Sequence, residues 1–443
     1  MSLLEAQLPE GRQWFRLGDA YEVTKKPRGL DVASLPEVPF VPMDAIPSGG
    51  AYAPGYTMRP PGEIRSGTYF ERGDALIAKI TPSFENGKQA LVTDLPTHFG
   101  FATTEVIPLR PCKEGQDKRL LFFYLLHPDV RHHIAGRMEG ATGRQRVPQD
   151  VLIELPFPKF KQEEQAAIAD SLEMIQCLKA VEMQSIQAAN NLKRSAMRTL
   201  FTCGLRGETQ RETEIGPIPE SWNFVTFASV REKLQYGTSV RCTYDVSGHP
   251  VLRIPNIEPQ RVTADDLKYC TLTGNDAAKY QLEVGDLIFI RTNGVLDRLG
   301  SCAVYDGNPA KALFASYLIR ARVKQEYVTP HFAAAFFGSE VGTSIVSARA
   351  ISASDGKFNL NTAAIDSLQL PLPPTLSEQR EIVAVLDTID HKIELHRRKH
   401  AVLEALFKAL LHKLMTGEIS VDELDLAAIA AKQPIGTGGC NSD

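Results

Sequence analysis

The sequence predicts an α+β fold with pseudo-twofold symmetry, in which two duplicated strand-rich domains are separated by two long helices that form an antiparallel coiled coil. The first observation is a repeated segment in which Leu-Pro-x-Pro precedes Glu-Gln, at positions 155–165 and again at 370–379. The second is a Gly-Asp dipeptide, at positions 73 and 285, that begins an apolar stretch in each half. The offsets between the copies, 214 and 212 residues, are nearly equal, which indicates an internal duplication.

Each half of the chain is interpreted as a domain followed by a helix. In both domains short apolar runs alternate with Gly and Pro, as is typical of strands joined by turns. We expect Trp14 and Trp222, near the two domain starts, to be core anchors. The expected segments are a first domain over 1–157, a first helix over 158–206, a second domain over 207–373, a second helix over 374–417 and a C-terminal tail over 418–443. The expected strands are 75–80, 89–92, 105–109, 286–290, 302–305 and 317–321, and the expected short helices are 120–126, 130–135 and 332–337.

The C-terminal helix has the clearest periodicity in the chain. From Ile382 to Leu414 the seam positions advance by alternate steps of four and three residues, which is a heptad pattern. A capping-box pattern begins at Thr375, and Gly417 follows the last seam position. The first helix, over about 163–203, has a seam that is apolar at both ends and polar in the middle. Each helix would be about 60 Å long, too long for burial in one small domain, so we expect the two to pair.

The polar middle of this seam suggests a contact that fixes the register of the helix pair. We expect Glu182 to lie opposite His396 or His400, because buried polar residues specify register in coiled coils. The alternative is that the two histidines lie at the solvated edge of the seam.

Composition narrows the class of protein. The seven cysteines include no Cys-x-x-Cys pair, which argues against a disulfide framework and against a cysteine zinc site. Neither an export leader nor an apolar run long enough to cross a bilayer is present, so we expect a cytoplasmic location and no membrane contact. The net charge of −4 argues only weakly against a nucleic-acid partner, because salt screens distant charges beyond about 8 to 10 Å.

The sequence lacks the usual catalytic motifs. It has no P-loop, no dinucleotide-binding glycine pattern, no His-Glu-x-x-His and no Gly-x-Ser-x-Gly. It also lacks the motif with which amino-methyltransferases hold a flipped adenine, and a nuclease cluster of paired carboxylates. His132 and His133 are adjacent on an expected helix, so their side chains point apart, and no partner lies at metal-ligand spacing. We therefore expect a non-catalytic chain without cofactor or metal.

The duplicated domains, each ending in Leu-Pro-x-Pro, Glu-Gln and a long amphipathic helix, resemble the specificity subunit of type I restriction-modification systems. The resemblance covers nearly the whole chain, up to Gly417. Its most specific element is the segment 370–379 followed by Ile382 and Leu386. The first copy departs from that element, with Lys159 in place of the last proline and one more residue before Glu-Gln.

The resemblance implies that each domain is a target recognition domain that reads one half of a bipartite, asymmetric site in double-stranded DNA. It further implies that the helices separate the domains and dock methyltransferase (modification) subunits, with two expected, and that restriction/translocase subunits join through the complex. Catalysis would belong to those other chains. The second interpretation is a coiled-coil scaffold whose duplicated domains bind proteins, and the third is a chain that modifies DNA itself.

Two polar loop regions align between the copies and are candidates for DNA contact. Residues 79–88 align with 291–298, and residues 142–146 align with 355–359. Arg and Lys favour guanine edges or phosphates, whereas Asn and Gln favour adenine. For any single residue an ordinary surface loop remains the alternative. The candidate DNA-binding residues are Lys79, Thr81, Asn86, Lys88, Arg144, Gln145, Arg146, Arg241, Arg291, Thr292, Asn293, Arg298, Lys357 and Asn359.

The two proline-rich exits are candidates for partner binding. A rigid proline segment that leads into a capped helix forms a natural docking edge for a partner helix. The alternative is that these residues only end a strand and begin a helix. The candidate partner-binding residues are Pro156, Pro158, Gln165, Pro371, Pro373, Pro374, Glu378 and Gln379.

Overall fold

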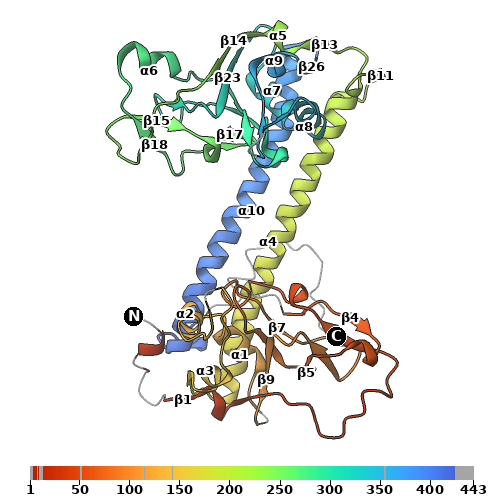
Figure 1. The fold of residues 1–443 in the computed structure, drawn as a ribbon, viewed down its shortest axis with the longest axis vertical. Helices are drawn as coiled ribbons and strands as arrows, with labels where there is room; N and C mark the ends of the chain where they lie inside the picture. Colours follow the sequence, from red (N-terminus) through yellow and green to blue (C-terminus); the bar gives the residue numbers. More distant parts are fainter. Residues whose placement is uncertain are drawn as a thin grey trace. The chain divides into compact units, whose positions relative to one another are not determined.

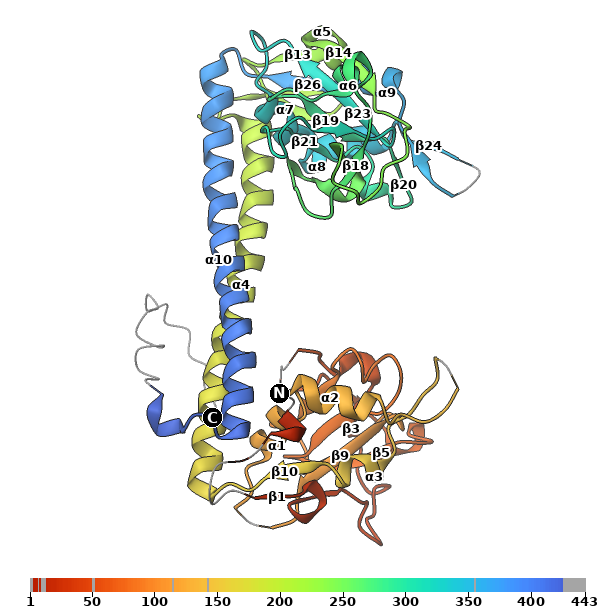
Figure 2. The ribbon, with the colours of Figure 1, turned by 90° about the vertical axis from the view of Figure 1, so that its left-hand side faces the viewer.

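The computed structural model describes residues 3–6, 8, 13–49, 52–113, 115–141, 143–353 and 356–424. The chain forms two compact units. Unit 1 comprises residues 1–184 and 397–443, and unit 2 comprises residues 185–396. Two long helices, α4 (Gln162–Cys203) and α10 (Leu376–Thr416), each contribute one part to unit 1 and the other part to unit 2. Within each unit the two helices run side by side (Figures 1 and 2).

The described part of unit 1 contains two mainly antiparallel sheets of four strands, a two-stranded ribbon and three short α-helices. The sheet orders are β2-β9-β6-β7 and β4-β3-β8-β5, and β1 pairs with β10 in the ribbon. The strands are β1 (Trp14–Arg16), β2 (Tyr21–Val23), β3 (Val38–Val41), β4 (Thr57–Arg59), β5 (Thr68–Glu71), β6 (Ala75–Ala78), β7 (Gln89–Leu91), β8 (Phe99–Ala102), β9 (Val106–Pro111) and β10 (Pro156–Pro158). The helices are α1 (Lys118–Tyr124), α2 (Pro128–Ala135) and α3 (Gln149–Ile153).

Unit 2 contains a six-stranded sheet, two three-stranded sheets, two ribbons and five short helices among its described residues. The sheet orders are β14-β23-β19-β21-β17-β16, β18-β15-β22 and β20-β25-β24. The strands are β11 (Gln210–Thr213), β12 (Gly216–Pro219), β13 (Asn223–Thr226), β14 (Arg231–Tyr236), β15 (His249–Leu252), β16 (Ile257–Glu258), β17 (Gln260–Val262), β18 (Lys268–Cys270), β19 (Leu287–Ile290), β20 (Thr292–Asn293), β21 (Cys302–Val304), β22 (Leu313–Phe314), β23 (Leu318–Val323), β24 (Ile351–Ser352), β25 (Phe358–Asn359) and β26 (Gln369–Leu372). The helices are α5 (Phe227–Val230), α6 (Gly274–Tyr280), α7 (Pro330–Phe337), α8 (Glu340–Ser347) and α9 (Thr362–Asp366).

The two units repeat one topology, so the predicted duplication is confirmed. The order β2-β9-β6-β7 of unit 1 corresponds to β14-β23-β19-β21 of unit 2, and the ribbon β1-β10 corresponds to β13-β26. Leu109 pairs with Ala75 in the first ladder, as Ala321 pairs with Leu287 in the second. Trp222, as expected, is buried, whereas Trp14 is only half-buried.

Apolar helix faces complete the core of each unit. In unit 1 the first part of α4 and the last part of α10 join the core of the domain. In unit 2 the last part of α4 and the first part of α10 take these places. Burial of apolar surface therefore attaches each domain to both helices at once. The helix residues concerned are Ile168, Leu172, Ile175, Phe407, Leu410, Leu411 and Leu414 in unit 1, and Met197, Leu200, Phe201, Ile382 and Leu386 in unit 2.

Ion pairs connect α4 and α10 where their seams are polar, and the pairing runs antiparallel in both units. In unit 1 the buried Lys179 pairs with Glu404. In unit 2 Lys193 lies 2.7 Å from the Asp390 carboxylate. The buried Glu182 lies 4.0 Å from the Lys399 ammonium group, and its predicted pairing with a histidine stays a prediction. Because a misplaced partner would leave a buried charge unpaired, these pairs favour one register.

Candidate nucleic-acid interface

In unit 2 the two loop regions chosen from the sequence meet. Strand β20 pairs antiparallel with β25, so that Thr292 lies opposite Asn359. The Leu360 backbone N–H also donates to the Arg291 carbonyl at 2.7 Å. This pairing brings Arg291, Thr292 and Asn293 together with residues 357–359, which are about 65 positions away in the sequence. The predicted Asp355 lies outside the described residues.

These residues line one of two adjoining hollows in unit 2. The first hollow, of about 770 Å³, is lined by Arg291, Thr292, Asn293, Gly294, Ala353, Lys357 and Asn359. The second, of about 510 Å³, is lined by Thr238, Ser239, Val240, Arg241, Cys242, Arg253, Pro255, Lys268 and Ala315. Ile254, Ser316 and Tyr317 line both hollows, so the two are continuous, and together they are called the unit 2 groove.

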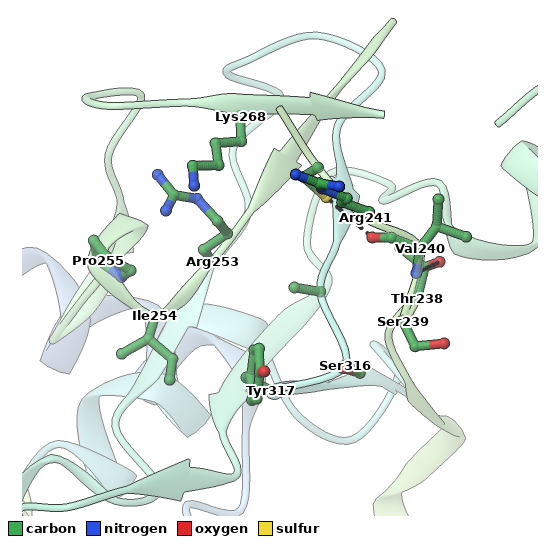
Figure 3. Close-up of a pocket in the computed structure, with 12 residues that line it drawn as sticks. Thr238, Ser239, Val240, Arg241, Arg253, Ile254, Pro255, Lys268, Ser316 and Tyr317 are labelled. Carbon is green, nitrogen blue, oxygen red and sulfur yellow. Dashed lines mark hydrogen bonds between the residues drawn. The ribbon is translucent and has the colours of Figure 1, made fainter. Parts of the chain in front are cut away.

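The unit 2 groove gathers cations around polar side chains. Figure 3 shows Arg241, Arg253 and Lys268 around the second hollow, together with the ring of Tyr317. Arg291 and Lys357 add two further cations in the first hollow. An array of this kind attracts phosphates, while the amides of Asn293 and Asn359 offer both a donor and an acceptor to base edges.

Internal contacts orient two of the arginines. The Arg291 guanidinium lies 4.7 Å from the centre of the Tyr236 ring and donates to the Ser316 carbonyl at 3.4 Å. Arg253 donates to the Asp266 carboxylate at 2.8 Å, which neutralises part of its charge. Tyr317, with 58% of its surface exposed, presents an aromatic face beside these groups, and such a face can stack on a base.

Among the charged and aromatic groove residues, Arg253, Lys268 and Tyr317 were not predicted from the sequence, whereas the predicted Arg298 lies elsewhere. Arg253, Lys268 and Tyr317 belong to segments that carry no polar loop pattern, and the ladder of β15 with β18 brings the first two together. A basic residue at the edge of a short strand, after Leu252 for Arg253 and before Tyr269 for Lys268, would have been the available signal. Arg298 is exposed, donates to the Ile257 carbonyl at 3.0 Å, and is not among the groove-lining residues.

In unit 1 the corresponding loops also meet. Isolated antiparallel bridges join Ile80 to Arg146 and Glu139 to Arg146. The Thr81 N–H donates to the Gln145 carbonyl at 3.0 Å, and the Val147 N–H donates to the Lys79 carbonyl at 2.7 Å. Both pairs of aligned loops are therefore assembled by backbone hydrogen bonds. The predicted Thr142 lies outside the described residues.

Two of the charged side chains in this unit 1 loop cluster have partners within the unit. Arg146 is exposed and pairs with Glu105 at 3.0 Å, and its hydrogen bond holds the pKa of the Glu105 carboxyl below its usual range. Lys88 donates to the Met43 carbonyl at 2.6 Å. Asn86 and Arg144 are exposed, whereas Lys79, Thr81 and Gln145 are half-buried.

The predicted partner-binding residues divide into buried and accessible ones. Pro158 pairs with Trp14 in the first ribbon, Pro371 pairs with Phe224 in the second, and both prolines are buried. Pro373, Gln165 and Gln379 are also buried, whereas Pro156 and Glu378 are half-buried and Pro374 is exposed. In unit 2 a hollow of about 340 Å³ beside Pro374 is lined by Asn223, Phe224, Val225, Val230, Glu326, Tyr327, Leu372, Pro373, Thr375 and Leu376.

Both buried glutamines hold the N-cap residue of a domain helix. Gln165 Oε1 accepts from the backbone N–H of Asp117, which caps α1, and its Nε2 donates to the Phe160 carbonyl. Gln379 Oε1 accepts from the backbone N–H of Thr329, which caps α7, and its Nε2 donates to the Tyr327 carbonyl. The repeated glutamine thus orients each long helix on its own domain, and its side chain is already fully engaged.

One cluster in unit 1 brings together possible metal ligands. Ligand atoms of His127, Asp129 and His412 lie within 4.8 Å of one another. However, the Asp129 N–H donates to His127 Nδ1 at 3.1 Å, and the Asp129 carboxylate accepts from the Leu3 N–H at 2.6 Å. His127 Nε2 lies 3.2 Å from His412 Nδ1, and burial lowers the pKa of His127 to about 4. A neutral His127 that accepts at Nδ1 carries its proton at Nε2, so the cluster is a hydrogen-bond chain that caps α2.

The chain is similar in sequence to proteins of one family. Residues 219–405 match the type I restriction modification DNA specificity domain. The EcoAI specificity subunit of Escherichia coli is 29% identical over 200 residues, which cover 44% of this chain and 33% of that one. The EcoKI specificity subunit of Escherichia coli K12 is 26% identical over 300 residues, 66% of this chain and 63% of that one. The chain spans between a third and a half of the length of the first curated relatives it matches.

Solved structures agree at the level of the fold. A chain from a type I restriction-modification system superimposes with a TM-score of 0.58 at 18% identity, covering 93% of this chain and 100% of that chain. The duplicated α+β fold with long helices is therefore shared with that solved chain. The predicted resemblance to type I restriction-modification specificity subunits is confirmed, since residues 219–405 match their DNA specificity domain and the curated relatives are specificity subunits. Among the described helices, none has the length and apolarity needed to span a membrane.

Proposed function

We propose that this chain is the non-catalytic DNA-recognition subunit of a type I restriction-modification complex. In this proposal each unit reads one half of a bipartite, asymmetric site in double-stranded DNA. Methyltransferase subunits, two in number, dock on the chain, and restriction/translocase subunits join through the complex in the cytoplasm. The observation that carries the proposal is the unit 2 groove, whose lining residues include five cations and the amides of Asn293 and Asn359.

The groove residues suggest a division of labour. Lysines and arginines at the margin would neutralise phosphates, which gives affinity that falls steeply with salt. Asn293 and Asn359 lie on the paired strands β20 and β25, where backbone hydrogen bonds restrict their positions. A well-placed amide discriminates between bases by about 1 to 3 kcal/mol. We therefore assign base reading to the two asparagines and phosphate binding to Lys268 and Lys357.

The accessible end of the second proline segment is the proposed docking site for a methyltransferase subunit. Pro374 and the half-exposed ring of Tyr327 lie at the 340 Å³ hollow next to the start of α10. An apolar side chain from a partner helix would fill such a hollow. The buried Pro371 and Gln379 would support this edge without touching the partner.

The test is a methylation map from cells with and without the gene, together with variants in the groove. Asn293→Ala is expected to relax the choice of base in one half-site by about 1 to 3 kcal/mol, and Lys268→Ala to weaken binding to all sequences about equally. Asn86→Ala, an exposed asparagine of unit 1, is the matched control and should leave the unit 2 half-site unchanged.

The same experiment separates the proposal from its alternatives. Exchange of residues 1–157 for those of a relative should change one half-site and preserve the other. Methylation that is unchanged by loss of the gene would favour a protein-binding scaffold. Methyl transfer by the purified chain alone would show that the chain is itself an enzyme.

A further inference from the structure

Two cysteines of unit 2 flank an isolated antiparallel bridge between separate segments. Thr243 and Tyr269 form an antiparallel bridge in which each N–H donates to the other's carbonyl, at 2.9 and 2.7 Å. Cys242 precedes Thr243 and Cys270 follows Tyr269, so the two cysteines lie next to this bridge and on the same side of it. A pair next to a hydrogen-bonded pair is a non-hydrogen-bonded pair, in which the Cα atoms are about 4.5 Å apart.

Side-chain contacts agree with this register. On the other side of the bridge, Lys268 Nζ lies 4.8 Å from the centre of the Tyr244 ring, as expected for an opposite pair on one face. Cys242 and Cys270 lie two residues along from Tyr244 and Lys268, and hence on the same face. Cys242 also packs against the apolar cluster that contains Cys270.

The two thiols differ in access. Cys270 is buried, with 2% of its surface exposed, whereas Cys242 is half-buried and lines the unit 2 groove. Burial raises the pKa of the Cys242 thiol, and the nearby Arg253 and Lys268 oppose that change. An oxidant that enters the groove would therefore meet Cys242 first, with Cys270 directly opposite.

We propose that Cys242 and Cys270 form a reversible cross-strand disulfide when the protein meets a two-electron oxidant of the peroxide class. A Cα separation of about 4.4 to 6.8 Å permits a disulfide, and the ladder position satisfies this range. Cys242 thiolate attacks the peroxide oxygen, which gives a sulfenic acid and releases water or an alcohol. Cys270 then attacks the Cys242 sulfur, and the hydroxyl group leaves as water with the Cys270 proton. Two thiols lose two electrons and two protons, and the peroxide is reduced.

The disulfide would change one wall of the unit 2 groove. It would join the segment that carries Arg241 and Tyr244 to β18, which carries Lys268, so this segment could no longer adjust separately to a ligand. This consequence rests on the proposed DNA-recognition function, whereas formation of the disulfide does not. A thiol reductant would restore the open form, because a thiolate attacks either sulfur of the bond.

Peptide mapping tests the bond directly. The purified full-length chain is treated with hydrogen peroxide, its remaining thiols are alkylated, and it is digested with trypsin without reductant. Cleavage after Arg241, Arg253, Lys268 and Lys279 gives peptides 242–253 and 269–279, with one cysteine each. We expect these two peptides as a linked species that is lost on reduction with dithiothreitol. The linked species should be absent from Cys242→Ser and unchanged in Cys112→Ser, which removes an exposed cysteine of unit 1.

The outcomes are distinct. Recovery of both peptides separately, while Cys112 in the same sample is oxidised, would overturn the proposal, as would a sulfinic acid or a mixed disulfide at Cys242 in place of the link. DNA affinity of the assembled complex is then compared before and after oxidation. A loss of about tenfold or more in the wild type, absent in Cys242→Ser, supports regulation, since tenfold corresponds to 1.4 kcal/mol. Unchanged affinity overturns regulation, and absence of DNA binding in the reduced complex counts against the proposed function alone.

Discussion

Unit 1 and unit 2 carry an aspartate at the same point of the same ladder and surround it differently. Asp74 precedes β6 and accepts from the Glu71 N–H at 2.8 Å, and Asp286 precedes β19 and accepts from the Glu283 N–H at 2.8 Å. In unit 2 Arg322 donates to both Asp286 oxygens, at 2.8 and 3.0 Å.

In unit 1 the matching arginine has other partners. Arg110 occupies the ladder position of Arg322 but pairs with Glu22 at 2.9 Å and with Glu71 at 3.4 Å. Burial then raises the pKa of Asp74 to about 6. One fold therefore surrounds the same buried carboxyl with a bidentate ion pair in unit 2, whereas in unit 1 the carboxyl accepts from the Glu71 N–H and burial disfavours its ionised form. The two units therefore share the backbone ladder at this point and differ in the ion pairs around the aspartate.

The largest expected effect comes from breaking the unit 2 ion pair. Asp286→Asn should destabilise unit 2 by about 3 to 5 kcal/mol, because it leaves the buried Arg320 without its carboxylate and leaves Arg322 with Glu283 as its acidic partner. Hydrogen exchange of β19 during urea unfolding measures this loss. Asp74→Asn, followed at β6, is the matched control. Equal costs at the two positions would show that the electrostatic difference between the units has no energetic consequence.

Replacement of the repeated glutamines should give an intermediate loss of stability. Gln379→Leu removes two hydrogen bonds between α10 and the domain, and should cost about 1 to 3 kcal/mol because the Thr329 N–H and Tyr327 carbonyl lose their partner. Gln165→Leu should cost less, since one of its bonds reaches only to the nearby Phe160.

Thermal unfolding of both variants against Gln184→Leu, an exposed glutamine of α4, provides the measurement and its control. A cost at Gln379 no greater than that at Gln184 would show that this glutamine does not hold the helix to its domain.

The smallest expected effect is a pH dependence of the stability of unit 1. The pKa of Asp74 in the folded protein, about 6, lies above its ordinary value of 3.8, so the folded state binds the proton more tightly than the unfolded state. The stability that this group contributes is present below about pH 4 and is lost as the pH rises through about 6. Asp74→Asn should therefore gain about 1 to 2 kcal/mol in unit 1 at pH 7 relative to the wild type, with little gain at pH 4. A pH profile of exchange at β6 that is identical in both proteins would contradict this assignment.

Local patterns in the sequence were sufficient for the main elements. The heptad steps and caps predicted α10. The Glu378 N–H donates to Thr375 Oγ1 at 3.2 Å, as the predicted cap requires. The expected helix over 332–337 is the last part of α7, and the expected strand over 286–290 contains β19. The expected strand start at Tyr317 was wrong, because β23 begins at Leu318 and the Tyr317 ring is exposed in the groove. The domain limits themselves stay a prediction.

The sequence by itself determined the duplication, the long helices and the loops that meet in each unit, because periodicity, caps and repeated motifs are properties of neighbouring residues. The tertiary structure alone decided which distant side chains became neighbours. Arg253 and Lys268 reach one groove, Gln379 reaches the cap of α7, and Cys242 faces Cys270 through the register of separate strands. Register depends on how strands pair across long loops, and residue spacing along the chain does not encode that pairing.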